Sequence, residues 1–217
     1  MFKKRIGITQ KVLKHNPYNE FMDCLDVRWA KFLSRLGILP IPLPLMSSSL
    51  AKNLWKEHKL DGLIISGGNT LVNYADKTDN LENISFERDK FEKALLKFAI
   101  LNGKPVFGVC RGLQIINIYY NGKLKKIKGH AGTRHSIISE VPSNKFKIPK
   151  EVNSFHDFAV PRSYLGKGLI SFAHDLNDNI EAFYHPKDKV MGIMWHPERE
   201  TLPSKSDCEL IKSHFNL

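Results

Sequence analysis

The chain has 217 residues, 42% of them hydrophobic and 25% charged, which is an ordinary globular composition and predicts one domain over residues 1–217. Its three cysteines, Cys24, Cys110 and Cys208, are widely spaced and odd in number, which excludes a disulfide framework and is typical of the reduced cytoplasm. No apolar run reaches the ~18 residues of a membrane helix, and the N-terminus is apolar for too few residues to be a signal peptide, so we expect a cytoplasmic protein without membrane contacts.

The formal net charge of +11 is unevenly distributed. Between residues 121 and 150 a single acid, Glu140, stands against eight bases: Lys123, Lys125, Lys126, Lys128, Arg134, Lys145, Lys147 and Lys150. A substrate that carries phosphate explains this segment, and a solvated basic face explains it equally well. We expect no nucleic acid partner, because no recognised nucleic-acid-binding module accompanies the charge.

Strands and helices alternate in the first half of the chain. Phe21, Leu25, Trp29, Phe32 and Leu36 recur at helical spacing, and Gly37 ends that pattern. Residues 62–66 are apolar throughout, which is typical of a central strand. The expected elements are, in order, a strand over 5–9, a helix over 20–36, a strand over 39–43, a helix over 48–57, a strand over 62–66, a loop over 67–83, a helix over 86–101, a strand over 105–109 and a helix to residue 120.

The second half has fewer helical patterns and more short strands. We expect strands over 135–139, 168–172, 180–184 and 190–194, and a closing helix over 206–214. The alternating first half predicts an α/β fold with a mainly parallel central sheet flanked by helices. The second half predicts an antiparallel extension of that sheet.

Cys110 lies in the turn between a buried strand and a helix. A thiol at a helix N-terminus faces backbone N–H groups and the positive end of the helix dipole, which favour the thiolate. Gly108 and Gly112 remove side chains on both sides, as a tight and strained turn requires. A buried structural cysteine is the alternative, but these glycines, Gln114 and a distant Trp-His-Pro-Glu run at 195–198 favour a nucleophile.

Four motifs together resemble those of class I glutamine amidotransferases: Gly-x-Cys-Arg-Gly-x-Gln at 108–114, Ser-Gly-Gly at 66–68, Val-Asn-Ser-Phe-His at 152–156 and Trp-His-Pro-Glu at 195–198. The arginine after the cysteine and the Asn-Ser-Phe-His segment are similar to the stand-alone γ-glutamyl hydrolase branch, peptidase C26. The resemblance extends from about residue 5 to residue 200. It implies a mainly parallel sheet with helices on both sides, and a Cys–His–Glu triad that hydrolyses a γ-glutamyl amide without a cofactor.

Carried over by motif, the nucleophile is Cys110, the base is His196 and the orienting carboxylate is Glu198. The oxyanion hole would use backbone N–H groups of Gly67 or Gly68 and of Arg111. The candidate substrate-binding residues are Gln114, which would contact the glutamyl group, and Asn69, Ser154 and His156. The loop at 69–71 and the segment at 121–126 depart from the family pattern, which leaves the triad intact and the identity of the substrate open.

These residue types suit the cleavage of an amide. His196 would take the thiol proton, return it to the leaving nitrogen and then activate water against the thioester. Glu198, two residues further along an extended segment, would lie on the same side and hold the imidazole tautomer. The Gly67–Gly68 turn would offer N–H groups without side-chain obstruction.

Several of these residues have a simpler interpretation. His156 has no role if it is an ordinary loop histidine beside Asp157, and the Arg111 side chain is as well explained by a structural ion pair as by a pocket. His130 and His135 are five positions apart with no cysteine or third ligand nearby in the sequence, so no metal site is expected.

The leaving amine is open. The resemblance includes short hydrolases of γ-glutamyl-aminobutyrate, from polyamine catabolism, and a hydrolase of γ-glutamyl-CDP-amidate, from phosphoramidate decoration of bacterial capsular polysaccharide. The basic 121–150 segment favours the nucleotide substrate. A glutaminase subunit that delivers ammonia to a partner synthase is an alternative, as is a non-catalytic binding protein. A homodimer is one assembly compatible with the sequence.

Overall fold

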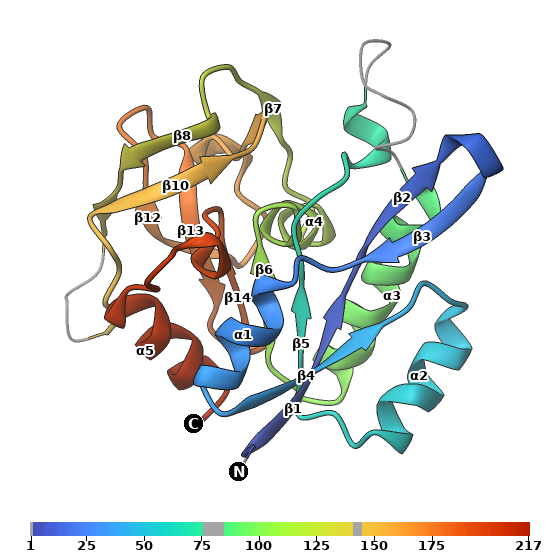
Figure 1. Ribbon diagram of the computed structural model, residues 1–217. Coiled ribbons are helices and arrows are strands. Elements are labelled where there is room, and N and C mark those ends of the chain that lie inside the picture. Colours follow the sequence, from blue (N-terminus) through green and yellow to red (C-terminus); the bar gives the residue numbers. More distant parts are fainter. Residues whose placement is uncertain (1, 76–84, 141–144) are drawn as a thin grey trace.

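The computed structural model describes residues 2–75, 85–140 and 145–217 of the chain (Figure 1). Its central feature is an eight-stranded sheet in the order β4-β1-β5-β6-β14-β13-β12-β9. The strands are β1 (Lys4–Thr9), β4 (Ile38–Leu43), β5 (Gly62–Ile65), β6 (Val106–Val109), β9 (Ile138–Ser139), β12 (Ile170–His174), β13 (Ile180–His185) and β14 (Val190–Ile193). The strands from β4 to β14 pair in parallel, and β13, β12 and β9 continue antiparallel. The predicted α/β fold and its antiparallel extension are confirmed.

Helices cover both faces of the sheet (Figure 1). The core on one face includes side chains of α2 (Ser48–Glu57), α3 (Phe86–Leu101) and α4 (Arg111–Tyr119). The core on the other face includes side chains of α1 (Arg28–Arg35) and α5 (Lys205–His214). β5 and β6 are buried along their whole length, as their continuous apolar sequences predict.

The predicted helix over 20–36 is wrong in its first part. β2 (Lys11–His15) and β3 (Glu20–Cys24) form an antiparallel hairpin, and the helix begins only at Arg28. Phe21, which appeared to belong to the apolar face of the helix, is 69% exposed on β3. The Asp26 carboxylate accepts the backbone N–H of Arg28 at 3.0 Å. A side chain that bonds the backbone in this way favours a turn, so the helix starts after it.

Two small sheets lie beside the antiparallel half. β8 (Ala131–Ser136) pairs with β10 (Glu151–Phe155), and β7 (Lys125–Lys126) pairs with β11 (Phe158–Ala159). The strand predicted over 135–139 is therefore divided between β8 and β9. Short 3-10 turns lie at Asn16–Tyr18, Val72–Tyr74, Arg162–Tyr164 and Pro197–Arg199. The predicted loop over 67–83 lies partly outside the described residues.

The topology brings three segments of the chain to one edge of the sheet. β6 lies between β5 and β14, and all three strands run in the same direction. Gly67, Cys110 and His196 follow these strands directly or within three residues. Ligands of open α/β sheets bind at the carboxyl ends of the strands, so a site is expected here. Within the ranges that the structure describes, no helix combines the length and apolarity needed to cross a membrane.

Candidate active site

The turn at Cys110 adopts a conformation that non-glycine residues rarely take. Its φ is +54° and its ψ is −108°, and Cys110 is the residue immediately before α4. The turn closes because two glycines allow it. A Cβ on Gly112 would lie 1.9 Å from the carbonyl oxygen of Ile65, and a Cβ on Gly108 would lie 2.6 Å from the Gly112 backbone. The strained turn places Cys110 at the N-terminus of α4.

The His196 imidazole is held from its backbone and from its ring. Nδ1 lies 2.7 Å from a carboxylate oxygen of Glu198, and both side chains are buried. The Asn153 amide donates to the carbonyl of His196 at 2.8 Å and accepts its N–H at 2.8 Å. The Phe155 ring lies edge-on to the imidazole, with 5.7 Å between centroids. Glu198 therefore fixes Nδ1 as the protonated nitrogen and directs Nε2 away from itself.

Cys110 and His196 are electrostatically coupled. Burial by itself lowers the pKa of His196, but Cys110 and Glu198 outweigh burial and raise that pKa to about 9. Gly67 packs against both residues, since a Cβ there would lie 2.7 Å from His196 Cε1 and 3.4 Å from Cys110 Cβ. The imidazole is therefore cationic at neutral pH, which is the state that stabilises a neighbouring thiolate.

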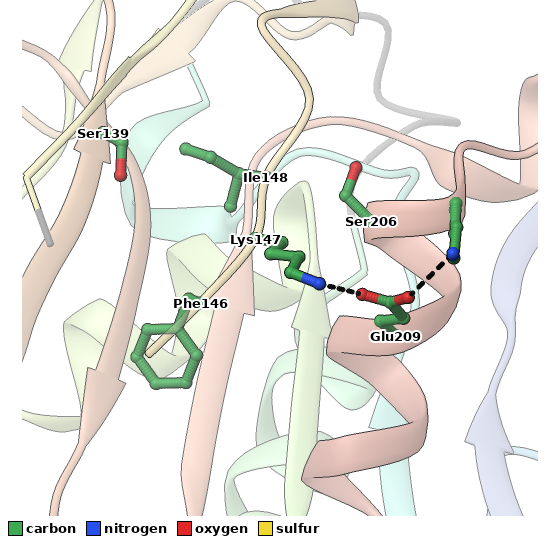
Figure 2. A pocket seen from close by; sticks show the side chains of 7 residues that line it. Ser139, Phe146, Lys147, Ile148, Ser206 and Glu209 are labelled. Atoms are coloured by element: carbon green, nitrogen blue, oxygen red, sulfur yellow. Dashed lines mark ion pairs between the residues drawn. The ribbon is translucent and has the colours of Figure 1, made fainter. Parts of the chain in front are cut away.

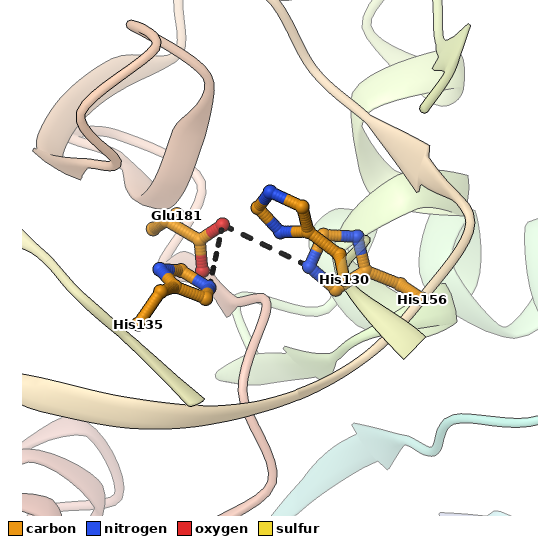
Figure 3. A group of neighbouring side chains, drawn as sticks. All are labelled: His130, His135, His156 and Glu181. Carbon is orange, nitrogen blue, oxygen red and sulfur yellow. Dashed lines mark ion pairs between the residues drawn. The ribbon is translucent and has the colours of Figure 1, made fainter. Parts of the chain in front are cut away.

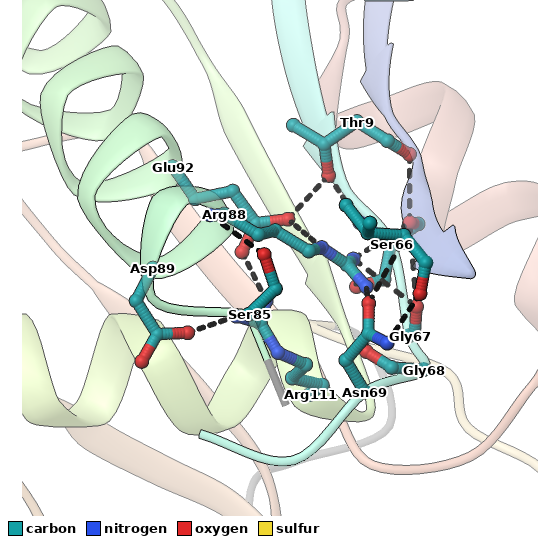
Figure 4. Close-up of polar contacts among 11 residues, drawn as sticks. Thr9, Ser66, Gly67, Gly68, Asn69, Ser85, Arg88, Asp89, Glu92 and Arg111 are labelled. Atoms are coloured by element: carbon teal, nitrogen blue, oxygen red, sulfur yellow. Dashed lines mark hydrogen bonds and ion pairs between the residues drawn. The ribbon is translucent and has the colours of Figure 1, made fainter. Parts of the chain in front are cut away.

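Arg88 of α3 holds the loop that follows β5 by hydrogen bonds (Figure 4). The guanidinium donates to the backbone carbonyls of Gly68 at 2.6 Å, Ser66 at 3.0 Å and Gly67 at 3.1 Å. In a trans peptide the N–H points opposite to the C=O. Because these carbonyls face Arg88, the N–H groups of Gly67 and Gly68 face the other way, as the predicted oxyanion hole requires.

Arg88 belongs to a buried set of charges that the sequence did not reveal. We call this set the arginine network, and its members are Arg88, Asp89, Glu92 and Arg111. Arg88 pairs with Glu92 at 2.8 Å, and Arg111 pairs with Glu92 and Asp89. Burial by itself raises the pKa of Glu92, but the two arginines outweigh it and lower that pKa. The Arg111 side chain is thus in a structural ion pair, which is one of the two roles the sequence left open.

Two predicted substrate contacts make hydrogen bonds to the protein backbone. Gln114 donates to the carbonyl of Phe158 at 3.0 Å. The Asn69 amide accepts the N–H of Val12 at 2.9 Å and donates to its carbonyl at 2.8 Å, which ties the loop after β5 to β2. Ser154 is fully buried on β10, and its hydroxyl has no hydrogen-bond partner among the described residues.

His156 lies in a second buried group, which we call the histidine cluster: His130, His135, His156 and Glu181 (Figure 3). The sequence offers no third ligand close to His130 and His135, but the fold brings His156 and Glu181 to them. Burial is the largest cause of a His156 pKa near 3 and of a Glu181 pKa well above its usual range. Asp175 and then Cys110 add to the rise in the pKa of Glu181.

A pocket of about 320 Å³ opens beside His196. Its lining comes from the β2–β3 hairpin, the start of α1, the loop after β5 and η5 (Pro197–Arg199), and includes Lys11, Asp26, Gly67, Gly68, His196 and Glu198. A second pocket, of about 430 Å³, lies between residues 146–148 and α5, where Lys147 pairs with Glu209 at 3.3 Å (Figure 2). None of the predicted site residues lines this second pocket.

The sequence pattern of the Peptidase C26 family matches residues 5–198 of this chain. The chain belongs to the peptidase C26 family. It is 32% identical to a γ-glutamyl-CDP-amidate hydrolase of Campylobacter jejuni, over 98% of each chain. It is 28% identical to a carbamoyl phosphate synthase small chain of Gracilaria tenuistipitata, over 85% of this chain and 42% of that one.

Solved structures of glutamine amidotransferases share the fold of this C26 member. The glutaminase domain of the CTPS of Trypanosoma brucei with bound acivicin superposes with a TM-score of 0.68, at 14% identity over 99% of this chain and 94% of that one. A glutamine amidotransferase of Thermotoga maritima gives a TM-score of 0.64, at 14% identity over 100% of this chain and 85% of that one. At such low identity the likeness concerns the arrangement of strands and helices alone.

Proposed function

We propose that this protein is a cysteine-dependent hydrolase that cleaves a γ-glutamyl amide and releases glutamate. One observation carries the proposal. Cys110, at a strained strand-to-helix turn, adjoins an imidazole whose far nitrogen is fixed by Glu198 at 2.7 Å. Membership of the C26 family and the 32% identical γ-glutamyl hydrolase support the same reaction class.

In the proposed reaction the Cys110 thiolate attacks the γ-carbonyl carbon. The N–H groups of Gly68, or of Gly67, and of Arg111 stabilise the oxyanion. Protonated His196 then gives its Nε2 proton to the leaving nitrogen, so that the C–N bond breaks and a γ-glutamyl thioester remains. His196, now neutral, takes a proton from water, which attacks the thioester. Glutamate leaves, and the thiolate–imidazolium pair is restored.

The reaction is tested with the isolated chain and a γ-glutamyl amide. We expect glutamate release and, after an acid quench, a γ-glutamyl adduct on the Cys110 peptide by mass spectrometry. The Glu198→Gln variant keeps the shape of the side chain but not its charge, so we expect turnover to fall by about 10³–10⁴. Full glutamate release by Cys110→Ala would disprove the proposal.

We propose γ-glutamyl-CDP-amidate as the substrate, with a role in phosphoramidate decoration of capsular polysaccharide. The 32% identical relative supports it. The basic strand β7 also pairs with β11, and the Phe158 carbonyl of β11 accepts from Gln114. In that register Lys126 pairs with Phe158 and exposed Lys125 with the next residue, Ala159, so we propose that Lys125 attracts the phosphates of a substrate bound at Gln114. Elsewhere in the basic segment, Arg134 is already paired with Glu151 and Glu200.

The substrate is tested by comparing kcat/KM for γ-glutamyl-CDP-amidate and for γ-glutamyl-aminobutyrate. We expect the nucleotide to be preferred by at least about tenfold, and Lys125→Ala to lower kcat/KM for the nucleotide alone. Lys150→Ala is the matched control, because it removes an exposed lysine of the same segment outside β7. A higher kcat/KM for γ-glutamyl-aminobutyrate would disprove the nucleotide substrate and favour the polyamine-derived one. It would leave the hydrolase proposal unchanged.

A glutaminase subunit is the second candidate. The similarity to a carbamoyl phosphate synthase small chain favours it. A subunit of this kind would hydrolyse glutamine only in the presence of a synthase partner. Glutamate release from γ-glutamyl amides by the isolated chain, faster than release from glutamine, would reject this candidate.

A further inference from the structure

The histidine cluster is a buried group of polar atoms without hydrogen-bond partners. Among the described residues, no partner reaches His130 Nδ1, His135 Nε2, His156 Nε2 or either carboxylate oxygen of Glu181. Buried polar atoms are normally satisfied, because leaving one unpaired costs about 1–3 kcal/mol. So many unpaired atoms in one place therefore indicate that something else binds there.

In each of the three histidines, the other ring nitrogen lies near an oxygen that can accept a hydrogen bond from it. His156 Nδ1 lies 3.0 Å from the carbonyl of Phe158, and His135 Nδ1 lies 3.2 Å from the carbonyl of Ser136. His130 Nε2 lies 3.7 Å from the Asp175 carboxylate. A carbonyl or carboxylate on one ring nitrogen fixes the proton there and leaves a lone pair on the other, as is usual for histidines that bind metals. In all three residues that other nitrogen is the unpaired one.

These lone pairs meet in one small space. Figure 3 shows the rings and the Glu181 carboxylate turned toward one another. One ligand atom from each of the four residues can be chosen so that all lie within 4.8 Å of one another. His135 Nε2 and His156 Nε2 lie 3.7 and 3.8 Å from Glu181 Oε1. Ligands of a tetrahedral zinc ion lie about 3.3 Å apart. The two histidine–Glu181 distances therefore need to shorten by about half an ångström or less, and the widest separation in the group by up to about 1.5 Å.

We propose that His130, His135, His156 and Glu181 bind one divalent transition-metal ion, with zinc the ion that their chemistry favours. Neutral imidazoles suit zinc and its first-row neighbours, whereas calcium and magnesium require oxygen ligands. Three nitrogens and one carboxylate oxygen supply four ligands. Four ligands in a tetrahedron are the usual geometry of structural zinc sites. Any proton on Glu181 leaves when the metal binds. This proposal does not depend on the proposed hydrolase activity.

The ligands come from three elements that the fold brings together. His130 immediately precedes β8 and His135 lies on it, His156 immediately follows β10, and Glu181 lies on β13 of the central sheet. A metal ion at this point joins the β8–β10 sheet to the central sheet. The ion is therefore expected to stabilise the segment that also carries Asn153, which holds the His196 backbone.

The test uses the full chain without a histidine tag, stripped with a chelator and titrated with Zn²⁺ by calorimetry. We expect one zinc per chain with a Kd below about 0.1 μM. Zinc at a hundredfold excess over Kd is expected to raise the Tm by about 5–10 °C. Co²⁺ is expected to give a tetrahedral d–d spectrum without a thiolate charge-transfer band, because the site contains no sulfur.

Four variants locate the ion. His135→Ala and Glu181→Gln each remove one ligand, so we expect zinc affinity to fall by at least about 100-fold. His58→Ala removes an exposed histidine outside the cluster and is expected to bind zinc like the wild-type chain. Cys110→Ala is also expected to bind one zinc, which separates the cluster from a thiolate site at Cys110 and His196.

Three results would overturn the proposal. In the first, the wild-type chain binds less than one zinc per chain at micromolar concentrations. In the second, both ligand variants bind zinc as tightly as the wild-type chain does. In the third, Cys110→Ala no longer binds zinc. Because the first of these is measured on the wild-type chain, the test stands even where a variant fails to fold.

Discussion

The arginine network and the histidine cluster are two groups of polar side chains that differ in one respect. In the arginine network every guanidinium and every carboxylate has a partner of opposite charge. In the histidine cluster one nitrogen of each imidazole and both oxygens of the Glu181 carboxylate have no hydrogen-bond partner among the described residues. The first group pairs all its charges with protein atoms and leaves one nitrogen, Arg111 Nε, without a hydrogen-bond partner among the described residues, whereas the second leaves five such atoms.

The difference shows how burial can serve two purposes. Arg88 uses its donors to turn three carbonyls of the loop after β5, so the network fixes the shape of the predicted oxyanion hole. Such a network is stabilised by the pairing of its opposite charges. The histidine cluster keeps lone pairs aimed into a common space instead, which costs stability until a cation occupies it.

The largest expected effect comes from the proposed nucleophile. Cys110→Ala is expected to lower kcat/KM for a γ-glutamyl amide by at least about 10⁴, because no other group can form the thioester. Circular dichroism should show an intact fold, since neither group loses a member. A variant that keeps more than about 1% of the activity would mean that the thiol is not the nucleophile.

Matched substitutions in the two groups test the comparison directly. Glu92→Gln leaves two buried guanidinium groups underpaired, so we expect the free energy of unfolding to fall by about 3–5 kcal/mol. Glu181→Gln in the metal-free chain breaks no hydrogen bond that the described residues make, so we expect a change within about 1 kcal/mol. Urea unfolding measures both.

An exposed pair provides the scale for these two values. Arg134 pairs with Glu151 and Glu200 at the surface, so Arg134→Ala is expected to cost less than about 1 kcal/mol. Equal losses for Glu92→Gln and Glu181→Gln would remove the distinction between the paired group and the unpaired one.

Gly67→Ala tests the loop that the arginine network holds. The added Cβ would lie 2.7 Å from His196 Cε1, so the imidazole or the loop must shift. We expect kcat to fall by about 10²–10³, which is the cost of losing one oxyanion donor, and KM to change less. Steady-state kinetics separate the two constants. An unchanged kcat would place the oxyanion elsewhere.

The smallest expected effect is a shift in the titration of His196. Its pKa is raised from 6.5 to about 9, so the stability that it contributes is fully present below pH 6.5 and is lost as the pH rises through 9. Cys110→Ala removes one cause of the raised pKa, so we expect the pKa of His196 to fall in that variant. Histidine NMR titration measures the shift, with His196→Gln assigning the signal.

The sequence predicted what depends on short patterns. The strand–turn–helix around Cys110, the capped helices over 48–57 and 86–101, and the apolar central strands all appear where their local patterns indicated. His196 and Glu198 are two residues apart, and their contact is present at 2.7 Å, although Pro197–Arg199 form a 3-10 turn instead of the predicted extended segment. Their catalytic roles stay a prediction, as does the role of Gln114 in binding the glutamyl group.

The first helix shows where local patterns fail. Apolar residues at helical spacing continued across Asp26, but Asp26 bonds the backbone of Arg28 and the residues before it pair with β2. The spacing of apolar residues alone cannot separate an exposed hairpin from a helical face, because the partner strand decides which side chains are buried.

Local patterns sufficed for the strands and helices between residues 38 and 119 and for the motifs that carry the thiol, the imidazole and the carboxylate, but not for the β2–β3 hairpin or the pairing of β8 with β10. The tertiary fold determines which distant side chains meet. Thr9 bonds Glu92 across 83 positions, and Gln114 bonds the backbone at Phe158 across 44. No local propensity encodes such pairs, because the topology of the sheet sets the distance between segments that the chain keeps far apart.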